Sequence, residues 1–93
     1  MAKHEDYLKQ NDDGSVDVTL SRPLTIDGAQ VSVVRLREPT VDDLLAGEEI
    51  KGSAANREVQ IFANLAEIST GDIRRLPARD YNRMQRAYGL FID

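Results

Sequence analysis

The sequence predicts an α+β fold, in which an N-terminal β-hairpin is followed by three or so α-helices. Two hydropathy patterns support this prediction. Apolar and polar residues alternate in the first part of the chain, which is the period of a half-buried strand, and apolar residues then recur every three or four positions, which is the period of a helix. Pro39 separates the two patterns, because it lacks a backbone donor and disfavours helical dihedrals at the preceding residue. The hairpin is expected over about residues 15–37 and the helices over about residues 41–50, 54–68 and 77–90.

The predicted hairpin has its turn at Asp27-Gly28. This pair favours a type I′ turn, which requires positive φ at both central residues. Pro23 interrupts the first strand, so that strand either lies at an edge of the sheet or contains a bulge. The return strand, residues 30–37, has apolar residues of both parities, which a bulge or burial of both faces would explain.

The junction between strand and helix carries a capping signal. Thr40 is a favourable N-cap, and Asp43 lies three residues later, where a carboxylate can bond back to the cap. Caps and X-Pro steps generally serve the architecture of a chain, so we interpret the junction as structural. It consists of Leu36, Arg37, Glu38, Pro39, Thr40, Asp43 and Leu44.

Each predicted helix has an apolar face, and we expect the second helix to form the centre of the core. Thr70 is expected to cap a short helical turn over residues 72–76, and Pro77 to be the first residue of the third helix. The residues of the apolar faces are Val41, Leu44, Leu45 and Ile50 in the first helix, Ile61, Leu65 and Ile68 in the second, and Tyr81, Met84 and Tyr88 in the third.

Composition indicates one small soluble domain. The chain has 93 residues, of which 41% are hydrophobic, with a net charge of −4 and no cysteine. We expect a flexible leader over residues 1–14 and a single domain over residues 15–93. The acidic charge disfavours nonspecific binding to nucleic acid or anionic membrane, and no apolar run approaches the ~20 residues of a membrane span. These features predict a cytoplasmic protein without disulfides.

The sequence offers little for catalysis. His4 is the only histidine and lies in the leader, so a positioned general base of the usual kind is absent, and Ser-His or Cys-His arrangements cannot be built. The glycines are isolated and form no phosphate-binding loop. Adjacent carboxylates such as Asp42 and Asp43 are typical of a solvated helix face. We therefore expect a protein that is not an enzyme and that binds no metal or cofactor.

Arginine is concentrated in the C-terminal part of the chain, where four arginines have the spacing of one helical face. This face has three interpretations: salt bridges with the acidic helix of its own or a neighbouring chain, a docking face for an acidic partner, or a DNA-binding face. The net negative charge disfavours the last, so a small DNA-binding regulator is the alternative function. An apolar cluster at the end of the chain is either core or a surface for an unfolded or helical client. The candidate partner-binding residues are Arg75, Arg79, Arg83, Arg86, Tyr88, Leu90 and Phe91.

Three runs of the sequence, in this order and spacing, resemble one known family. They are VTLSRPLTIDG at residues 18–28, VRLREPTVDDL at residues 34–44, and LAEIS at residues 65–69, continued by IRRL at residues 73–76, Asp80-Tyr81 and Phe91. Together they are similar to the tail assembly chaperones of contractile-tailed bacteriophages of the Mu-like and P2-like kind. The similarity extends over residues 16–92 and excludes the leader.

The resemblance implies a factor of virion assembly that acts in the cytoplasm of the bacterial host. Proteins of this family bind the long helical tape measure protein, keep it soluble and help tail tube subunits polymerise around it, and they are absent from the finished particle. The expected partners are therefore the tape measure protein and, as a second candidate, the tail tube protein, with self-association as an open alternative. In many relatives a translational frameshift adds a C-terminal extension, so this chain would be the short form. The family has no catalytic residues to carry over.

Overall fold

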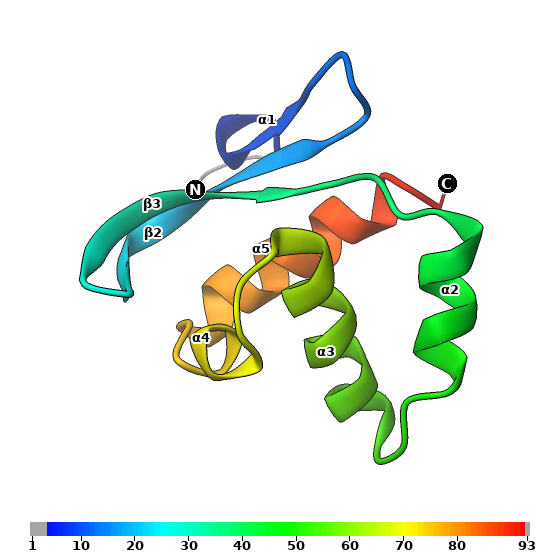
Figure 1. Cartoon of the computed structure of the whole chain (residues 1–93). Helices are drawn as coiled ribbons and strands as arrows, with labels where there is room; N and C mark the ends of the chain where they lie inside the picture. The colour runs from blue at the N-terminus through cyan, green and yellow to red at the C-terminus, as the bar shows by residue number, and fades with distance from the viewer. Residues whose placement is uncertain (1–3, 93) are drawn as a thin grey trace.

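The computed structural model describes residues 4–92, with side chains from residue 6 onward, and has the predicted α+β architecture (Figure 1). A short helix and three strands precede four further helices. The elements are α1 (His4–Tyr7), β1 (Leu8–Gln10), β2 (Val16–Ile26), β3 (Ala29–Leu36), α2 (Val41–Glu48), α3 (Ala54–Ala66), α4 (Thr70–Arg74) and α5 (Ala78–Gly89).

The three strands form one antiparallel sheet in the order β1-β2-β3. Asp27 and Gly28 have φ angles of 50° and 83°, as the predicted type I′ turn requires, so the hairpin prediction is confirmed. The register between β2 and β3 shifts between Thr19 and Leu24, and Pro23 lies within this irregular stretch. Both predicted explanations apply to Pro23: the register is irregular there, and β1 pairs only with residues 16–18 of β2, so that Pro23 lies on a part of β2 that is free of β1.

Part of the predicted leader belongs to the fold, which corrects that prediction. β1 pairs with the beginning of β2, with Leu8 opposite Val18. The Tyr7 side chain is buried beneath Arg83, whose guanidinium carbon lies 4.3 Å from the centre of the tyrosine ring. A lone apolar pair, Tyr7-Leu8, looks insufficient in the sequence, but elements formed much later in the chain bury it. Residues 1–3 of the leader lie outside the described residues.

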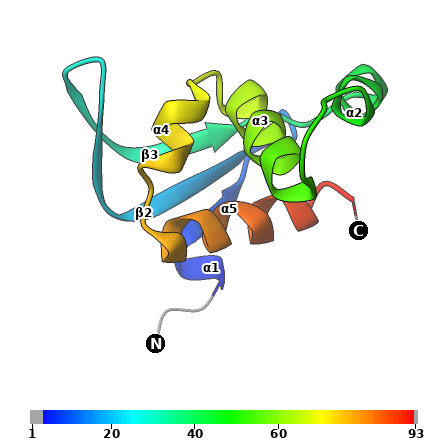
Figure 2. The same cartoon turned by 90° about the horizontal axis from the view of Figure 1, so that it is seen from below.

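The core lies between the sheet and the helices. Figures 1 and 2 show α3, α4 and α5 on one face of the sheet, with α2 standing apart beside α3. Alternate strand residues contact the predicted apolar stripes of α3 and α5. The prediction that residues 54–68, now α3, form the centre of the core is therefore confirmed. The most deeply buried apolar residues are Val16, Val18, Leu36, Phe62, Leu65, Met84 and Ala87.

The helix starts follow the predicted caps, with two local corrections. Thr40 is the N-cap of α2, as expected. Ser69, rather than Thr70, is the N-cap of α4, because Ser69 has Asp72 three residues later: the Asp72 N–H donates to Ser69 Oγ at 3.0 Å, and the Ser69 N–H donates to the Asp72 carboxylate at 3.0 Å. Pro77 is the N-cap of α5 rather than its first residue.

Candidate protein-binding surfaces

Two of the arginines predicted to bind a partner donate to the chain's own sheet. Arg75 Nη2 donates to the Thr25 carbonyl oxygen at 2.6 Å, and Arg83 Nη1 donates to the Thr19 carbonyl oxygen at 2.8 Å. Both carbonyls belong to β2. These bonds hold the C-terminal helices against the sheet, which is a structural role that the arginine pattern alone did not reveal.

Arg86 and Arg79, the other two arginines predicted to bind a partner, have different surroundings in the structure. Arg86 Nη1 donates to the Tyr7 hydroxyl at 2.6 Å and so links α5 to the N-terminal segment. Arg79 is exposed at the start of α5. Three of the four arginines therefore make contacts within the chain, and the role of the four in binding an acidic partner or DNA stays a prediction.

The apolar cluster at the end of the chain divides between core and surface. The Tyr88 ring lies 5.6 Å from the Phe62 ring and 6.2 Å from the Phe91 ring, measured between centroids. Tyr88 and Phe91 thus extend the core, whereas Leu90 and Ile92 are exposed. Of the three apolar residues predicted to bind a partner, Leu90 presents the most accessible side chain.

The junction motif connects the end of β3 to two helices through Asp43. Arg37 donates to both Asp43 carboxylate oxygens, at 2.7 and 2.9 Å. The Thr40 N–H donates to the same carboxylate at 2.7 Å, and Asn64 Nδ2 of α3 donates to it at 3.3 Å. The bonds from Arg37, followed by those from Thr40, hold the pKa of the Asp43 carboxyl well below its ordinary value. The interpretation of this motif as structural rests on these contacts.

The remaining junction residues lie on either side of this connection. Leu36 is fully buried in the core. The Glu38 carboxylate lies so close to Gly14, whose φ is +91°, that a side chain at Gly14 would collide with it. Pro39 is half-buried, and Leu44 lies on the accessible face of α2.

The apolar face predicted for α2 exists but is not buried against the core. Val41 is 70% exposed, Leu44 45% and Leu45 59%. The residue that α2 buries is Gly47, and a Cβ placed there would lie 3.0 Å from Ile61 Cδ1 of α3. Val41 and Leu45 are the more exposed of the three, whereas Leu44, three residues before Gly47, lies beside the contact with α3.

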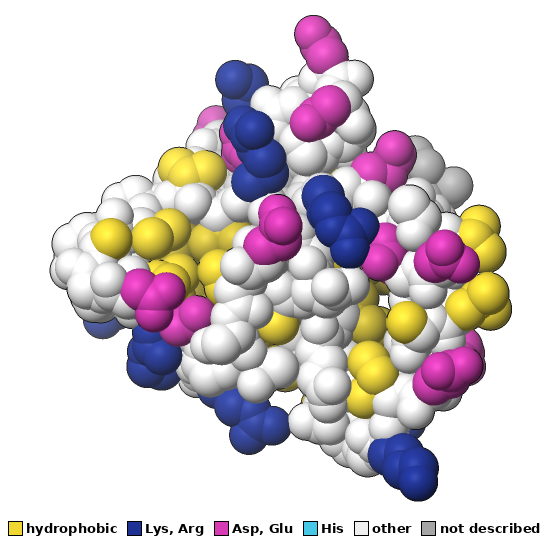
Figure 3. Space-filling view, viewed as in Figure 1, with side chains coloured by type: hydrophobic (Ala, Val, Ile, Leu, Met, Phe, Trp, Pro, Cys, Tyr) yellow, Lys and Arg dark blue, Asp and Glu magenta, His cyan; other side chains and the backbone are white. Residues whose placement is uncertain are grey.

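A groove runs between α2 and the two longer helices. It has a volume of about 580 Å³. Its walls include aliphatic and aromatic side chains as well as one acidic and one basic residue. Figure 3 shows hydrophobic side chains gathered over α2 at the right edge of the molecule, with acidic side chains beside them. The lining residues are Leu44, Gly47, Glu48, Arg57, Ile61 and Tyr88.

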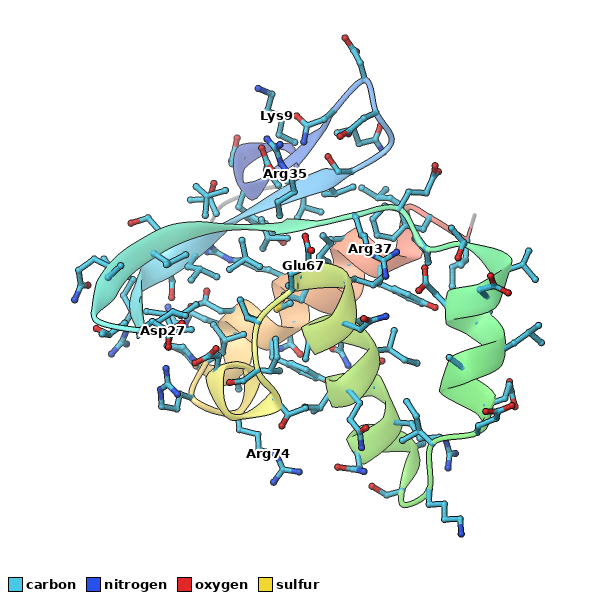
Figure 4. The ribbon with its side chains drawn as sticks, in the orientation of Figure 1. Lys9, Asp27, Arg35, Arg37, Glu67 and Arg74 are labelled. Carbon is cyan, nitrogen blue, oxygen red and sulfur yellow. The ribbon has the colours of Figure 1, made fainter. Side chains whose placement is uncertain are left out.

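A second, smaller groove of about 310 Å³ borders β3, the edge strand of the sheet. Its floor is aliphatic and includes Val33, which is 47% exposed. Arg35, Arg37 and Glu67 also line this groove, and Figure 4 labels all three side chains. Arg35 is ion-paired with Asp17 at 2.7 Å, and Arg37 is bound to Asp43, so both cations are already neutralised within the chain.

Among residues 4–92, no group of three or more histidine, cysteine, aspartate or glutamate side chains is placed to hold a metal ion. No helix in the same range combines the length and hydropathy needed to cross a membrane.

Exposed aliphatic side chains beside two grooves of a small α+β fold are typical of a module that binds other proteins. The sequence matches a family described as phage tail assembly chaperone proteins, E, or 41 or 14, over residues 17–93. The chain belongs to this family, and the resemblance stated from the sequence runs is confirmed. The comparisons with curated proteins and with solved structures return no match.

Sequence reasoning missed the residues that decide how α2 is presented. Glycine generally weakens a helix, whereas Gly47 permits close contact between α2 and α3. Asn64 was not singled out, although it donates to Asp43 across the two helices. A glycine within a helix is a signal that could have predicted this close approach of α2 to another helix.

Proposed function

We propose that this tail assembly chaperone binds the tape measure protein, keeps it soluble, and assists the assembly of tail tube subunits around it without an enzymatic step. The family match supports a role in tail assembly. The observation that carries the more specific proposal is the exposure of large aliphatic side chains on a chain of only 93 residues. They are Val33, Val41, Leu44, Leu45, Leu90 and Ile92.

Such a surface suits a client that is long, helical and insoluble alone. Apolar area removed from water stabilises a complex by about 25 cal/mol per Å², so a few aliphatic contacts give weak binding at each point. Many weak contacts along one client give tight overall binding through avidity, and they remain reversible one at a time. This reversibility fits a chaperone that acts in the cytoplasm of the bacterial host and leaves before a contractile tail is complete.

Co-expression with the tape measure protein of the same phage tests the proposal. We expect the tape measure protein to move from the insoluble to the soluble fraction and to co-purify with the chaperone. Purified virions should contain the tape measure protein but not the chaperone, as judged by mass spectrometry. A tape measure protein that stays insoluble and does not co-purify would refute the assignment of this client.

A further inference from the structure

We propose that the outward face of α2, together with the groove between α2 and α3, binds an amphipathic α-helix whose apolar stripe is bordered by lysine or arginine. This inference rests on the proposed function and specifies the surface and the chemistry of the client. The outward face of α2 is defined here as Val41, Leu44, Leu45, Asp42, Glu48 and Glu49.

The apolar part of this face has helical spacing and stays accessible. Val41, Leu44 and Leu45 occupy positions i, i+3 and i+4, so they form one stripe along α2. Leu44 also lines the groove, which places the stripe next to Ile61 and Tyr88. A partner helix laid along this line would pack its own apolar residues into the groove beside α2, as amphipathic helices do in hydrophobic grooves.

The charged part of this face has one sign. Asp42 and Glu49 are seven residues apart, which is close to two helical turns, so both border the same side of the stripe, and Glu48 lies at its C-terminal end. All three side chains are exposed. Asp43 is not available to a partner in the same way, because Arg37 already binds both of its oxygens.

The acidic side chains beside the stripe have no basic residue next to them on α2, and Arg57, the cation that lines the groove, donates to the Gly52 carbonyl oxygen at 2.7 Å. Residues 38–49 include five acids and no lysine or arginine. Complementary charges on a partner attract it and align it, while like charges directly opposite repel it. The border therefore favours a helix with basic flanks and disfavours one with acidic flanks.

The anchoring of α2 keeps this face ready for binding. Asp43 is bound by Arg37 and Asn64, and Gly47 lies directly against Ile61, so one side of α2 is held to the rest of the chain. A surface that is already ordered loses less conformational entropy when it binds. The groove beside β3 has a different character, since a sheet edge suits an extended segment rather than a helix.

Two designed peptides test the charge requirement on the intact chain. Each has about 20 residues and the same leucine stripe, a length sufficient for an isolated helix. One peptide carries lysine on both borders of the stripe and the other carries glutamate, and binding is measured by fluorescence anisotropy. We expect the lysine peptide to bind at least about tenfold more tightly than the glutamate peptide, with the difference shrinking as salt rises.

Substitutions on the outward face of α2 test the location of the site. Leu45→Ser should weaken binding of the lysine peptide by about tenfold or more, and the double change Asp42→Lys with Glu49→Lys should reverse the preference between the two peptides. Val33→Ser is the matched control, because Val33 is a similarly exposed aliphatic residue beside the other groove. It should leave binding unchanged. Circular dichroism spectra and melting curves must show that each variant is folded, which is expected because the substituted side chains are exposed.

The outcomes separate this inference from the proposed function. If Leu45→Ser binds the lysine peptide as well as the unsubstituted chain does, or if the glutamate peptide binds equally well, the inference is wrong. If Leu45→Ser still solubilises the tape measure protein as the unsubstituted chain does, the proposed function stands and this surface is excluded. If the unsubstituted chain binds the lysine peptide through Leu45 but does not solubilise the tape measure protein, the surface stands and the assigned client is wrong.

Discussion

Asp80 connects α5 to the irregular part of β2. Its side chain is fully buried, and its carboxylate accepts the Ser21 backbone N–H at 2.8 Å and the Ser21 hydroxyl at 3.0 Å. Arg83 Nε lies 3.9 Å away. Ser21 lies within the stretch where the register between β2 and β3 shifts, so its N–H finds its partner on a helix rather than on a strand. One buried carboxylate thus satisfies the backbone where the sheet is interrupted.

Replacement of Asp80 by alanine should destabilise the fold by about 1–3 kcal/mol, because the Ser21 N–H and hydroxyl would both lose the carboxylate that accepts from them. Chemical denaturation monitored by circular dichroism measures this loss. Arg79→Ala, at the neighbouring exposed position, is the control and should change the free energy of unfolding by less than about 0.5 kcal/mol. Equal stability of the two variants would show that Asp80 does not support the bulge.

At the scale of elements, α2 is attached to the molecule by a narrow contact. Its apolar residues point outward, and its close approach to α3 occurs at Gly47 against Ile61. Polar bonds through Asp43 provide the second connection. An amphipathic helix of only eight residues would be marginal alone, so these few contacts hold it in place.

A valine at position 47 should force α2 away from α3 and cost about 1–3 kcal/mol, the usual range for overpacking a close contact. Ala46→Val is the matched control, because it introduces the same β-branched residue at the adjacent, exposed position. Thermal melts of the two variants measure the difference. The proposed close packing would be disproved by similar melting curves.

At the scale of the whole molecule, several carboxylates are held in their charged form by the fold. Arg35 lowers the pKa of Asp17, the Ser69 backbone N–H lowers that of Asp72, and Arg37 lowers that of Asp43. A carboxyl whose pKa is lower in the folded chain stabilises the fold above its unfolded pKa, and this contribution is lost as pH falls through the folded value. The chain therefore becomes less stable in acid, although its exposed ion pairs contribute little individually.

We expect the midpoint of urea unfolding to fall steadily as pH decreases below about 4, the ordinary pKa of an aspartate. Asp43→Asn should be less stable than the unsubstituted chain at pH 7, because the bonds to the carboxylate are weakened. It should also lose less stability on acidification, because position 43 can no longer take up a proton when the chain unfolds. Asp42→Asn, an exposed neighbour, is the control and should keep the unsubstituted dependence on pH. A parallel pH dependence for Asp43→Asn and the unsubstituted chain would exclude Asp43 as a contributor.

The sequence by itself determined the local structure. The Asp27-Gly28 turn, the Thr40–Asp43 capping box and the stripe centred on Leu65 depend on residues a few positions apart, and the structure has all three. The family could be recognised for the same reason, since its motifs lie in these local features. Helix starts could be predicted closely because a cap requires a particular side chain at a particular spacing.

The tertiary structure alone decided what each surface faces. Tyr7 is buried by a helix that begins some 70 residues later, a contact that no local pattern announces. Arg83 binds a carbonyl of β2, so a face that looked available in the sequence supports the sheet. Leu45 has the helical spacing of a core residue, yet the contact of Gly47 with α3 turns it outward. Spacing determines which residues share a face, whereas burial depends on which distant element covers that face, and this is why the candidate binding surface emerged only from the fold.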